Sequence, residues 1–176
     1  MAEIRVKGLA ELNAYLQAFP VKLEANIMRG ALRAGLKPIK DAAVSNAPVG
    51  EPSENNKRQY KLYAGALRDS IRISARIRKR EGKVTASLYA GGKSRKTGAD
   101  VYYAHIIELT GARAHSLSDG GKGEINHPGV RSQPFLRPAV DAQSNNAILA
   151  AASYIRNRLQ TKHGIDTSDI DLSIGE

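Results

Sequence analysis

The chain has 176 residues, with 41% hydrophobic and 25% charged residues, which suits one globular domain with its own core. The absence of cysteine excludes disulfides and thiolate metal sites, and an aromatic fraction of 5% without Trp argues against a stacking platform for single-stranded nucleic acid. No stretch approaches the roughly 20 apolar residues of a membrane span, and the N-terminus does not resemble a secretory signal. We therefore expect a protein that is made and folded in the cytoplasm, without membrane contact.

Two helices are predicted in the first 46 residues. A short amphipathic helix begins near Leu9, because Leu9, Leu12 and Leu16 recur at helical spacing after a strand-like start at residues 4–6. A longer helix is predicted over residues 21–46.

The longer helix contains residues that are unusual inside helices. Pro38 is expected to kink or interrupt it near its middle. Gly30 and Gly35 each cost about 1 kcal/mol relative to Ala in a helix interior. We therefore expect them to allow close approach to a sheet or to another subunit.

Residues 65–90 predict a β-hairpin, on which the rest of the fold is organised. From Leu67 to Ile77, apolar side chains at odd positions alternate with polar ones, mostly Arg, which is typical of a strand with one buried face. Gly82 suits a turn over residues 80–83, and residues 84–90 alternate again. The prediction is an α+β fold, in which N-terminal and C-terminal helices pack on a small antiparallel sheet built around this hairpin.

The remaining segments predict loops, one more helix and a tail. Residues 51–61, 91–100 and 114–130 are polar or Gly-rich, and we expect mobile loops there, whereas the apolar residues 101–109 could form a strand or a helical turn. A last helix is predicted from Phe135 to about Lys162, with Pro138 in its first turn. We expect one domain over residues 1–163 and an acidic, mobile tail over residues 164–176 that could dock on a basic neighbour.

The formal charge of +10 is concentrated on the predicted hairpin and the loop after it. Three interpretations remain open: a solvated sheet face that prevents aggregation, a contact for an acidic protein, or a contact for nucleic acid. The candidate basic surface consists of Arg72, Arg76, Arg78, Lys79, Arg80 and Lys83.

Residues typical of catalysis or metal binding are scarce. The four His residues show no metal-binding spacing, and Gly120–Gly123 lacks the spacing of a phosphate-binding loop. Glu108 lies in an apolar run, and we expect it to pair with an Arg of the hairpin or of a neighbouring chain. The sequence therefore predicts no catalytic, cofactor or metal site, and no enzyme.

Four motifs in order resemble a known family. Val6–Leu12, Gly65–Ile71, Tyr103–Gly111 and Gln133–Val140 resemble elements of the tail-completion, or neck, proteins of long-tailed bacteriophages, the group of the lambda Z protein. Gly65 would permit the turn into the hairpin, and Leu67 with Ile71 would anchor its first strand. The candidate assembly and fold residues are Gly65, Leu67, Arg68, Ser70, Ile71, Tyr103, Glu108, Pro134, Phe135, Leu136, Arg137 and Pro138.

The resemblance implies a structural virion protein assembled in the host cytoplasm. It would form a six-fold or twelve-fold ring in the neck that completes the tail and joins it to the head connector. Its partners would be copies of itself and neighbouring connector, stopper, tail-terminator or tail-tube proteins, with transient contact to DNA in the lumen. The alternative is a basic nucleic-acid-binding protein. Two features argue against it: the Arg residues lie on a strand, and no aromatic residues are interleaved with them.

Overall fold

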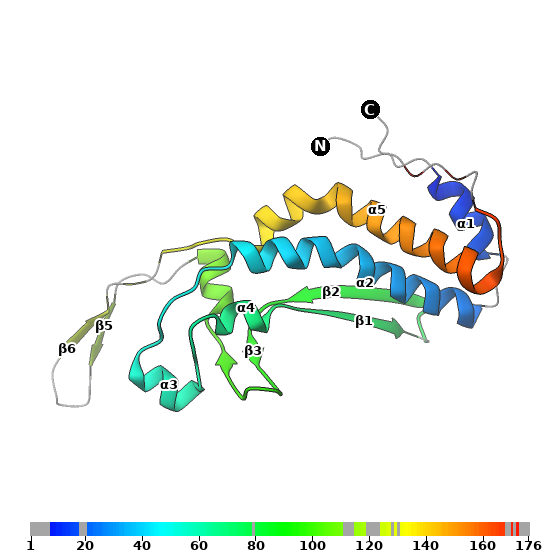
Figure 1. Cartoon of the computed structure of the whole chain (residues 1–176). Helices are drawn as coiled ribbons and strands as arrows, with labels where there is room; N and C mark the ends of the chain where they lie inside the picture. Colours follow the sequence, from blue (N-terminus) through cyan, green and yellow to red (C-terminus); the bar gives the residue numbers. More distant parts are fainter. Residues whose placement is uncertain are drawn as a thin grey trace. The chain divides into compact units, whose positions relative to one another are not determined.

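The computed structural model describes residues 8–17, 21–78, 80–110, 115–118, 124–127, 129, 131–167, 170 and 172. The predicted strand at residues 4–6 and Lys79 lie outside these residues. The elements (Figure 1) are α1 (Leu9–Gln17), α2 (Val21–Asn46), α3 (Glu54–Tyr60), α4 (Ala66–Ser70), β1 (Arg72–Arg78), β2 (Lys83–Tyr89), β3 (Gly92–Lys93), β4 (Asp100–Val101), the π-helix η1 (Ile106–Thr110), β5 (His115–Ser118), β6 (Glu124–His127) and α5 (Leu136–His163). The predicted α+β class is confirmed.

The chain divides into two compact units. The first combines residues 1–42, 73–88 and 139–176, and the second combines residues 43–72 and 89–138. Each unit is therefore built from segments that are distant in the sequence. The expectation of a single domain stays a prediction.

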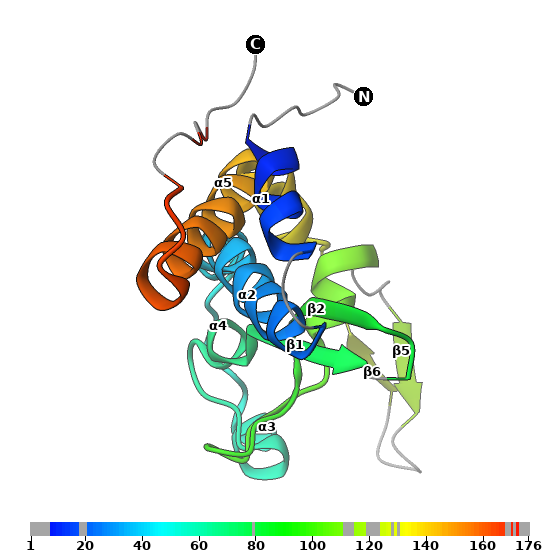
Figure 2. The same cartoon turned by 90° about the vertical axis from the view of Figure 1, so that its right-hand side faces the viewer.

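Helices α2 and α5 lie side by side in the first unit (Figures 1 and 2). The ring of Tyr154 on α5 fills the space that a Cβ at Gly30 would occupy. A Cβ at Gly35 would lie 2.8 Å from the carbonyl oxygen of Ala147 and 3.2 Å from the Cβ of Ala151. The predicted close approach at both glycines is thus confirmed, but the neighbour is helix α5 and not a sheet or another subunit.

Pro38 lies inside α2, and the helix continues through it. The predicted interruption is therefore wrong. A proline inside a helix costs about 3 kcal/mol, because one hydrogen bond is lost and the ring crowds the preceding turn. Buried residues before and after Pro38, among them Ala31, Ile39 and Ala43, hold the helix in place and offset this cost.

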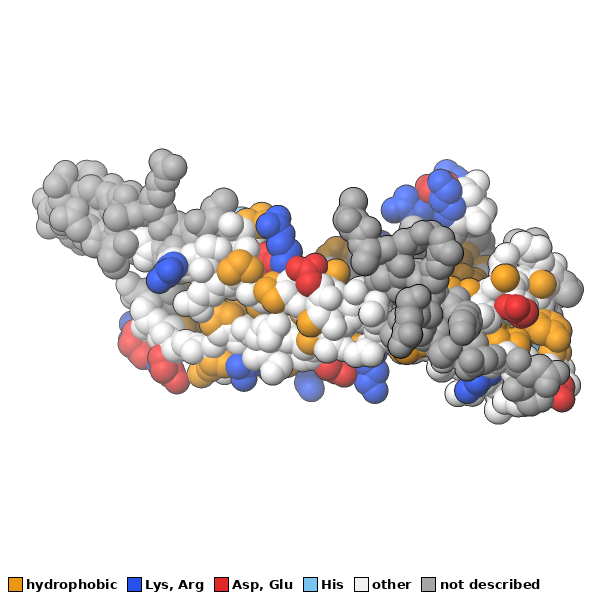
Figure 3. Space-filling model, turned by 90° about the horizontal axis from the view of Figure 1, so that it is seen from above, with side chains coloured by type: hydrophobic (Ala, Val, Ile, Leu, Met, Phe, Trp, Pro, Cys, Tyr) orange, Lys and Arg blue, Asp and Glu red, His pale blue; other side chains and the backbone are white. Residues whose placement is uncertain are grey.

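The strands β1 and β2 form the predicted hairpin, with Gly82 in the turn at a φ of 61°. Arg76 and Arg78 are exposed while Ile73 and Ile77 are half-buried, as the alternation predicted. Figure 3 shows Lys and Arg side chains gathered where the turn of this hairpin projects. The predicted start of the first strand is wrong, because Ala66–Ser70 forms the short helix α4 and β1 begins at Arg72.

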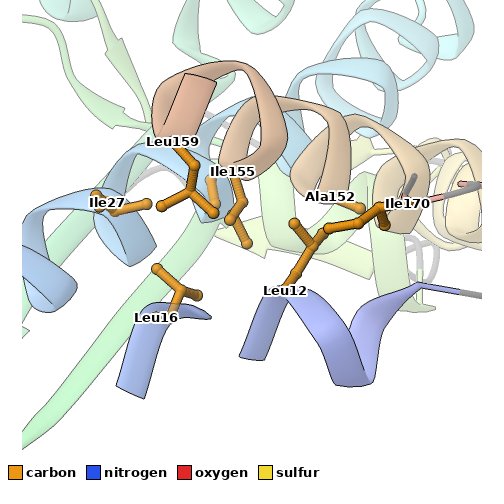
Figure 4. Close-up of a cluster of buried hydrophobic side chains, with 8 residues drawn as sticks. Leu12, Leu16, Ile27, Ala152, Ile155, Leu159 and Ile170 are labelled. Carbon is orange, nitrogen blue, oxygen red and sulfur yellow. The ribbon is translucent and has the colours of Figure 1, made fainter. Parts of the chain in front are cut away.

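A cluster of buried apolar side chains forms the core of the first unit (Figure 4). It joins three helices and the segment after α5, and consists of Leu12, Leu16, Ile27, Ala31, Ala152, Ile155, Leu159 and Ile170. Among the described residues, no helix combines the length and the apolar character that crossing a membrane requires.

Part of the predicted mobile tail packs on this core. Ile170 is buried, its carbonyl oxygen accepts a hydrogen bond from Nη1 of Arg156 at 3.4 Å, and Ile165 and Leu172 pack against the cluster. The expectation of a wholly mobile tail is therefore wrong for these residues, because the tail carries apolar side chains that a core can bury. Asp169, Asp171 and Glu176 lie outside the described residues.

The predicted loop at residues 51–61 contains helix α3 in the second unit. Oγ of Ser53 accepts a hydrogen bond from the backbone N–H of Asn56 at 3.4 Å, which caps the helix N-terminus. Lys57 and Glu54 form an ion pair of 2.9 Å one turn apart. Lys61, at a φ of 54°, ends the helix in the left-handed conformation. These capping interactions are local, and the lack of an apolar pattern concealed them.

The other two predicted loops contain short strands of the second unit. In residues 91–100, β3 pairs with β4 in antiparallel register, with Gly92 opposite Val101, and the backbone N–H of Ser94 donates to the carbonyl oxygen of Ala99 at 2.8 Å. In residues 114–130, β5 pairs with β6, with His115 opposite His127. The apolar run after β4 forms the π-helix η1.

Candidate assembly site

Within the second unit, the side chains of Ser70 and Arg72 bind the backbone of Gly91. Oγ of Ser70 donates to the carbonyl oxygen of Leu67 at 2.7 Å and accepts from the N–H of Gly91 at 2.8 Å. Nη1 of Arg72 donates to the carbonyl oxygens of Gly91 at 2.7 Å and Ser70 at 3.1 Å. Both backbone groups of Gly91 are thus bound by side chains. This satisfies polar groups in a buried place, where an unpaired one costs about 1–3 kcal/mol.

Gly91 has no room for a side chain. Its φ of 86° is in the left-handed region, and a Cβ there would lie 2.7 Å from the carbonyl oxygen of Val101 and 2.8 Å from the Cβ of Ala104. The sequence alone does not single out this residue, because only the folded chain brings residues 101–104 against it. Gly65, by contrast, has a φ of 89° with open space around it, so its requirement is conformational only.

Arg68 links α4 to the end of α2, because its Nε donates to the carbonyl oxygen of Ala47 at 2.9 Å. Leu67 and Ile71, on either side of it, are buried. The predicted role of these two residues as anchors of a strand is wrong, since Leu67 lies on α4 and Ile71 is its C-terminal cap. They anchor the helix that precedes the strand.

Glu108 caps the N-terminus of α5. Its Oε2 accepts hydrogen bonds from the backbone N–H groups of Phe135 at 2.8 Å and Leu136 at 2.9 Å, and its Oε1 accepts from Arg137 at 3.1 Å. The first four N–H groups of a helix have no partner within the helix, and Pro138 removes the fourth because proline has no N–H. One carboxylate therefore satisfies every free donor at this helix end, and its charge also suits the positive end of the helix dipole.

The expected pairing of Glu108 with an Arg of the hairpin is therefore wrong, whereas a pairing with an Arg of a neighbouring chain stays a prediction. The sequence contained a usable signal, namely an acid in an apolar run and a helix start whose Leu136 lacks a nearby Ser, Thr, Asp or Asn to cap it. Two further hydrogen bonds join η1 to the segment before α5. The carbonyl oxygen of Ile107 accepts from the N–H of Gln133 at 2.9 Å and from Oγ of Ser132 at 3.3 Å. Phe135 is fully buried beside them, as predicted.

An open groove of about 760 Å³ lies within the second unit beside these motifs. Val49 and Tyr102 line it and are 51% and 45% exposed. The ring of Tyr102 lies with its centroid 4.6 Å from that of Tyr60 and 5.7 Å from that of Tyr103. Most of the lining is apolar or aromatic, and includes Pro48, Pro52, Leu62, Tyr63, Leu67, Ile106 and Ile107, with Glu51, Arg131 and Gln133 as polar members.

Two tyrosines of the groove have raised pKa values. The hydroxyl of Tyr63 donates to Oδ2 of Asp69 at 2.7 Å, and this bond raises the pKa of Tyr63 because it favours the protonated phenol. Burial raises the pKa of Tyr103. The Tyr63 hydroxyl thus ties the groove wall to α4 through Asp69.

All twelve candidate assembly and fold residues fall in the second unit. Among the candidate basic residues, Arg76, Arg78, Arg80 and Lys83 are exposed on the hairpin or its turn. Arg72 differs from them, because its guanidinium is engaged with Gly91 and stacks on the ring of Tyr89 at 5.7 Å. Among the described residues, no three His, Asp or Glu side chains are grouped so that they could hold a metal ion.

A family model matches more than half of the chain. Residues 10–109 match the family described as "Bacteriophage HK97-gp10, putative tail-component". The chain belongs to this HK97-gp10-like family. The matched part contains the motif Gly65–Ile71 and overlaps Val6–Leu12 and Tyr103–Gly111, whereas Gln133–Val140 lies beyond it. No curated protein and no solved structure gives a match.

Membership of the HK97-gp10-like family confirms the predicted assignment to bacteriophage tail proteins. The chain is therefore a tail component, and its location is the virion. The narrower likeness to the lambda Z group stays a prediction, as do the ring and the neck position.

Proposed function

We propose that this HK97-gp10-like tail component forms a homo-oligomeric ring in the neck, where it completes the tail and joins it to the head connector. The observation that carries the proposal is the family match over residues 10–109, which contains the motif Gly65–Ile71 and overlaps Val6–Leu12 and Tyr103–Gly111. In this role binding and assembly are the whole activity, and no catalytic step is proposed.

The groove of the second unit supports an assembly role. Exposed apolar surface that is gathered in one place commonly marks a protein interface, and Val49 and Tyr102 are both exposed in the lining of this groove. In a ring, we propose that this surface is covered by the neighbouring copy. The hydrogen bonds of Ser70, Arg72 and Glu108 would keep the surface rigid, which lowers the entropic cost of binding.

The test is the mass of the protein in solution, measured by native mass spectrometry and light scattering over a range of concentrations. The expected result is a closed oligomer of six or twelve copies, or a monomer that forms one only with the connector or tail-tube protein of the same phage. A chain that stays monomeric alone and with each of these partners would contradict the proposal.

Two matched variants test the groove. Val49→Asp should abolish ring formation without unfolding, because it places a charge in an apolar contact. Val140→Asp, at a residue of α5 that is 45% exposed and outside the groove lining, should leave the ring intact. Equal effects of the two substitutions would contradict a role for the groove.

A further inference from the structure

The polar face of the β1–β2 hairpin is defined by one contact and the alternation of strands. The guanidinium of Arg72 lies over the ring of Tyr89, which places even residues of β1 and odd residues of β2 on the same face. We call this face the cationic face. Its residues are Arg72, Ser74, Arg76, Arg78, Lys83, Thr85, Ser87 and Tyr89.

The cationic face is open and nearly free of acids. Arg76, Arg78 and Lys83 are exposed, and so is Arg80 in the turn of the hairpin. Between residues 72 and 89 the sequence has six Lys or Arg residues and one acid, a formal charge of +5 and half of the charge of the chain. That acid, Glu81, pairs with Arg78 at 3.2 Å in the turn, where both side chains are about half exposed.

The opposite face of the hairpin is apolar. Ile73, Ala75 and Ile77 of β1 and Val84, Ala86 and Leu88 of β2 are half-buried. The hairpin thus turns its apolar side chains to one face and its cations and hydroxyls to the other. A ligand that approaches the cationic face meets cations and hydroxyls, together with the ring of Tyr89 under Arg72.

The composition of the cationic face favours a phosphate backbone over a protein. Protein interfaces usually have a core of aromatic and aliphatic anchors, whereas this face has no aliphatic residue and one aromatic residue, Tyr89, whose ring lies under Arg72. Phosphate oxygens are contacted mainly by Arg and Lys, together with Ser and Thr hydroxyls, which are the residues present here. Alternate residues of a strand are about 6.6 Å apart, so Arg76 and Arg78 can reach successive phosphates along one DNA strand.

We propose that the cationic face binds the sugar-phosphate backbone of duplex DNA without regard to sequence. The inference goes beyond ring formation and does not depend on it, since it rests on the hairpin of the first unit. Backbone contacts of this kind are electrostatic, so the affinity should fall steeply with salt.

The experiment measures binding of the full chain to a fluorescent 20-base-pair duplex by anisotropy, at several salt concentrations. The hairpin triple variant carries Arg76→Gln, Arg78→Gln and Lys83→Gln. The matched control carries Arg29→Gln, Arg33→Gln and Lys37→Gln, which remove three charges from exposed positions of α2. A third variant, Arg76→Lys with Arg78→Lys, keeps the charge of the face.

We expect the hairpin triple to weaken binding at least about tenfold and to reduce the salt slope by about 2–3, because each lost phosphate contact removes about 0.9 from it. The control triple should change the affinity less than about threefold, and the Lys variant should bind like the wild type. Absence of wild-type binding at low salt, or equal losses in both triples, would overturn the proposal. Tighter binding of poly-glutamate than of the duplex would assign the face to an acidic protein instead.

Two controls separate this result from folding and assembly. Thermal unfolding should give the same Tm for the hairpin triple and the wild type, and native mass spectrometry should give the same oligomer. If the triple proves unstable, Arg80→Gln with Lys83→Gln replaces it, because both residues are exposed at the turn. A loss of DNA binding with the oligomer intact supports the proposal. A loss of the oligomer with DNA binding intact concerns the proposed ring and not the cationic face.

Discussion

Glu108 caps the N-terminus of α5 with a single side chain. Its two carboxylate oxygens accept three backbone N–H bonds, between 2.8 and 3.1 Å, from the start of α5. Hydrogen bonds to an ionised acceptor are about twice as strong as neutral ones, and an N–H left unpaired costs about 1–3 kcal/mol. Within the second unit, the position of residues 135–137 beside η1 thus depends on this residue.

Glu108→Gln is expected to lower the free energy of unfolding by about 1–3 kcal/mol, because the amide offers one acceptor oxygen and turns an NH₂ donor toward N–H donors. Urea denaturation measures the change. Asp141→Asn, at an exposed position of the same helix, should change stability by less than about 0.5 kcal/mol. Similar losses for the two variants would show that charge alone, and not the cap, is responsible.

Tyr103 should make stability depend on pH in the alkaline range. Burial, and to a smaller extent the neighbouring Tyr102, raise the pKa of Tyr103 above its ordinary value of 10.0. Because the folded protein holds the proton more tightly, the contribution to stability is complete below the ordinary pKa and is lost as the pH rises through the raised one.

Denaturation of the wild type and of Tyr103→Phe between pH 8 and 11 checks this dependence. The wild type should lose more stability than the variant over this range. Tyr63 shares the raised pKa and remains in both proteins, so the difference between them isolates Tyr103. Parallel pH curves would contradict the burial of its hydroxyl.

At the scale of elements, small residues set the distance between α2 and α5. Gly35 contacts the backbone of Ala147, and the ring of Tyr154 packs over Gly30. The helices approach each other where their side chains are smallest, and the apolar cluster of Ile27, Ile155 and Leu159 lies in the same unit. The continuous path of α2 through Pro38 belongs to the same packing.

Gly35→Ala is expected to destabilise the protein although Ala is the better helix former. The change gains about 1 kcal/mol in helix propensity, but the new Cβ would lie 2.8 Å from a backbone oxygen, and overpacking of this kind costs about 1–3 kcal/mol. Calorimetric Tm values check the sign. Ser45→Ala, exposed on the same helix, should be neutral or slightly stabilising. A raised Tm for Gly35→Ala would contradict the close approach.

At the scale of the whole molecule, the charge of +10 opposes assembly of identical copies. Salt screens this repulsion, because the Debye length falls from about 10 Å at 0.1 M to about 3 Å at 1 M. If the ring is held by the apolar groove, its oligomer fraction should rise with salt.

Light scattering at 0.05 M and 0.5 M NaCl measures this dependence at a fixed protein concentration. Addition of DNA at low salt should favour the oligomer as well, since it neutralises the cationic face. Dissociation at high salt would contradict an apolar interface. It would point instead to contacts between opposite charges of neighbouring copies.

The sequence by itself determined the parts of the fold that depend on regular patterns. The bounds of α2, the extent of α5, the turn at Gly82 and the alternation of Arg76 and Arg78 with Ile77 all follow from periodicity. A hydrophobic repeat of 3.6 or 2 residues acts along one segment, so it can be read without knowledge of the neighbours. The motifs also pointed to bacteriophage tail proteins, the class of the family that matches.

Only the tertiary structure decided which groups the motif residues bind. Ser70 and Arg72 hold Gly91, and Glu108 caps a helix that begins 28 residues later along the chain, at Leu136. Helices α3 and α4 were missed because capping bonds and burial, and not an apolar repeat, stabilise them. Such contacts join residues that are distant in the sequence, and no local pattern records which donor meets which acceptor once the chain has folded.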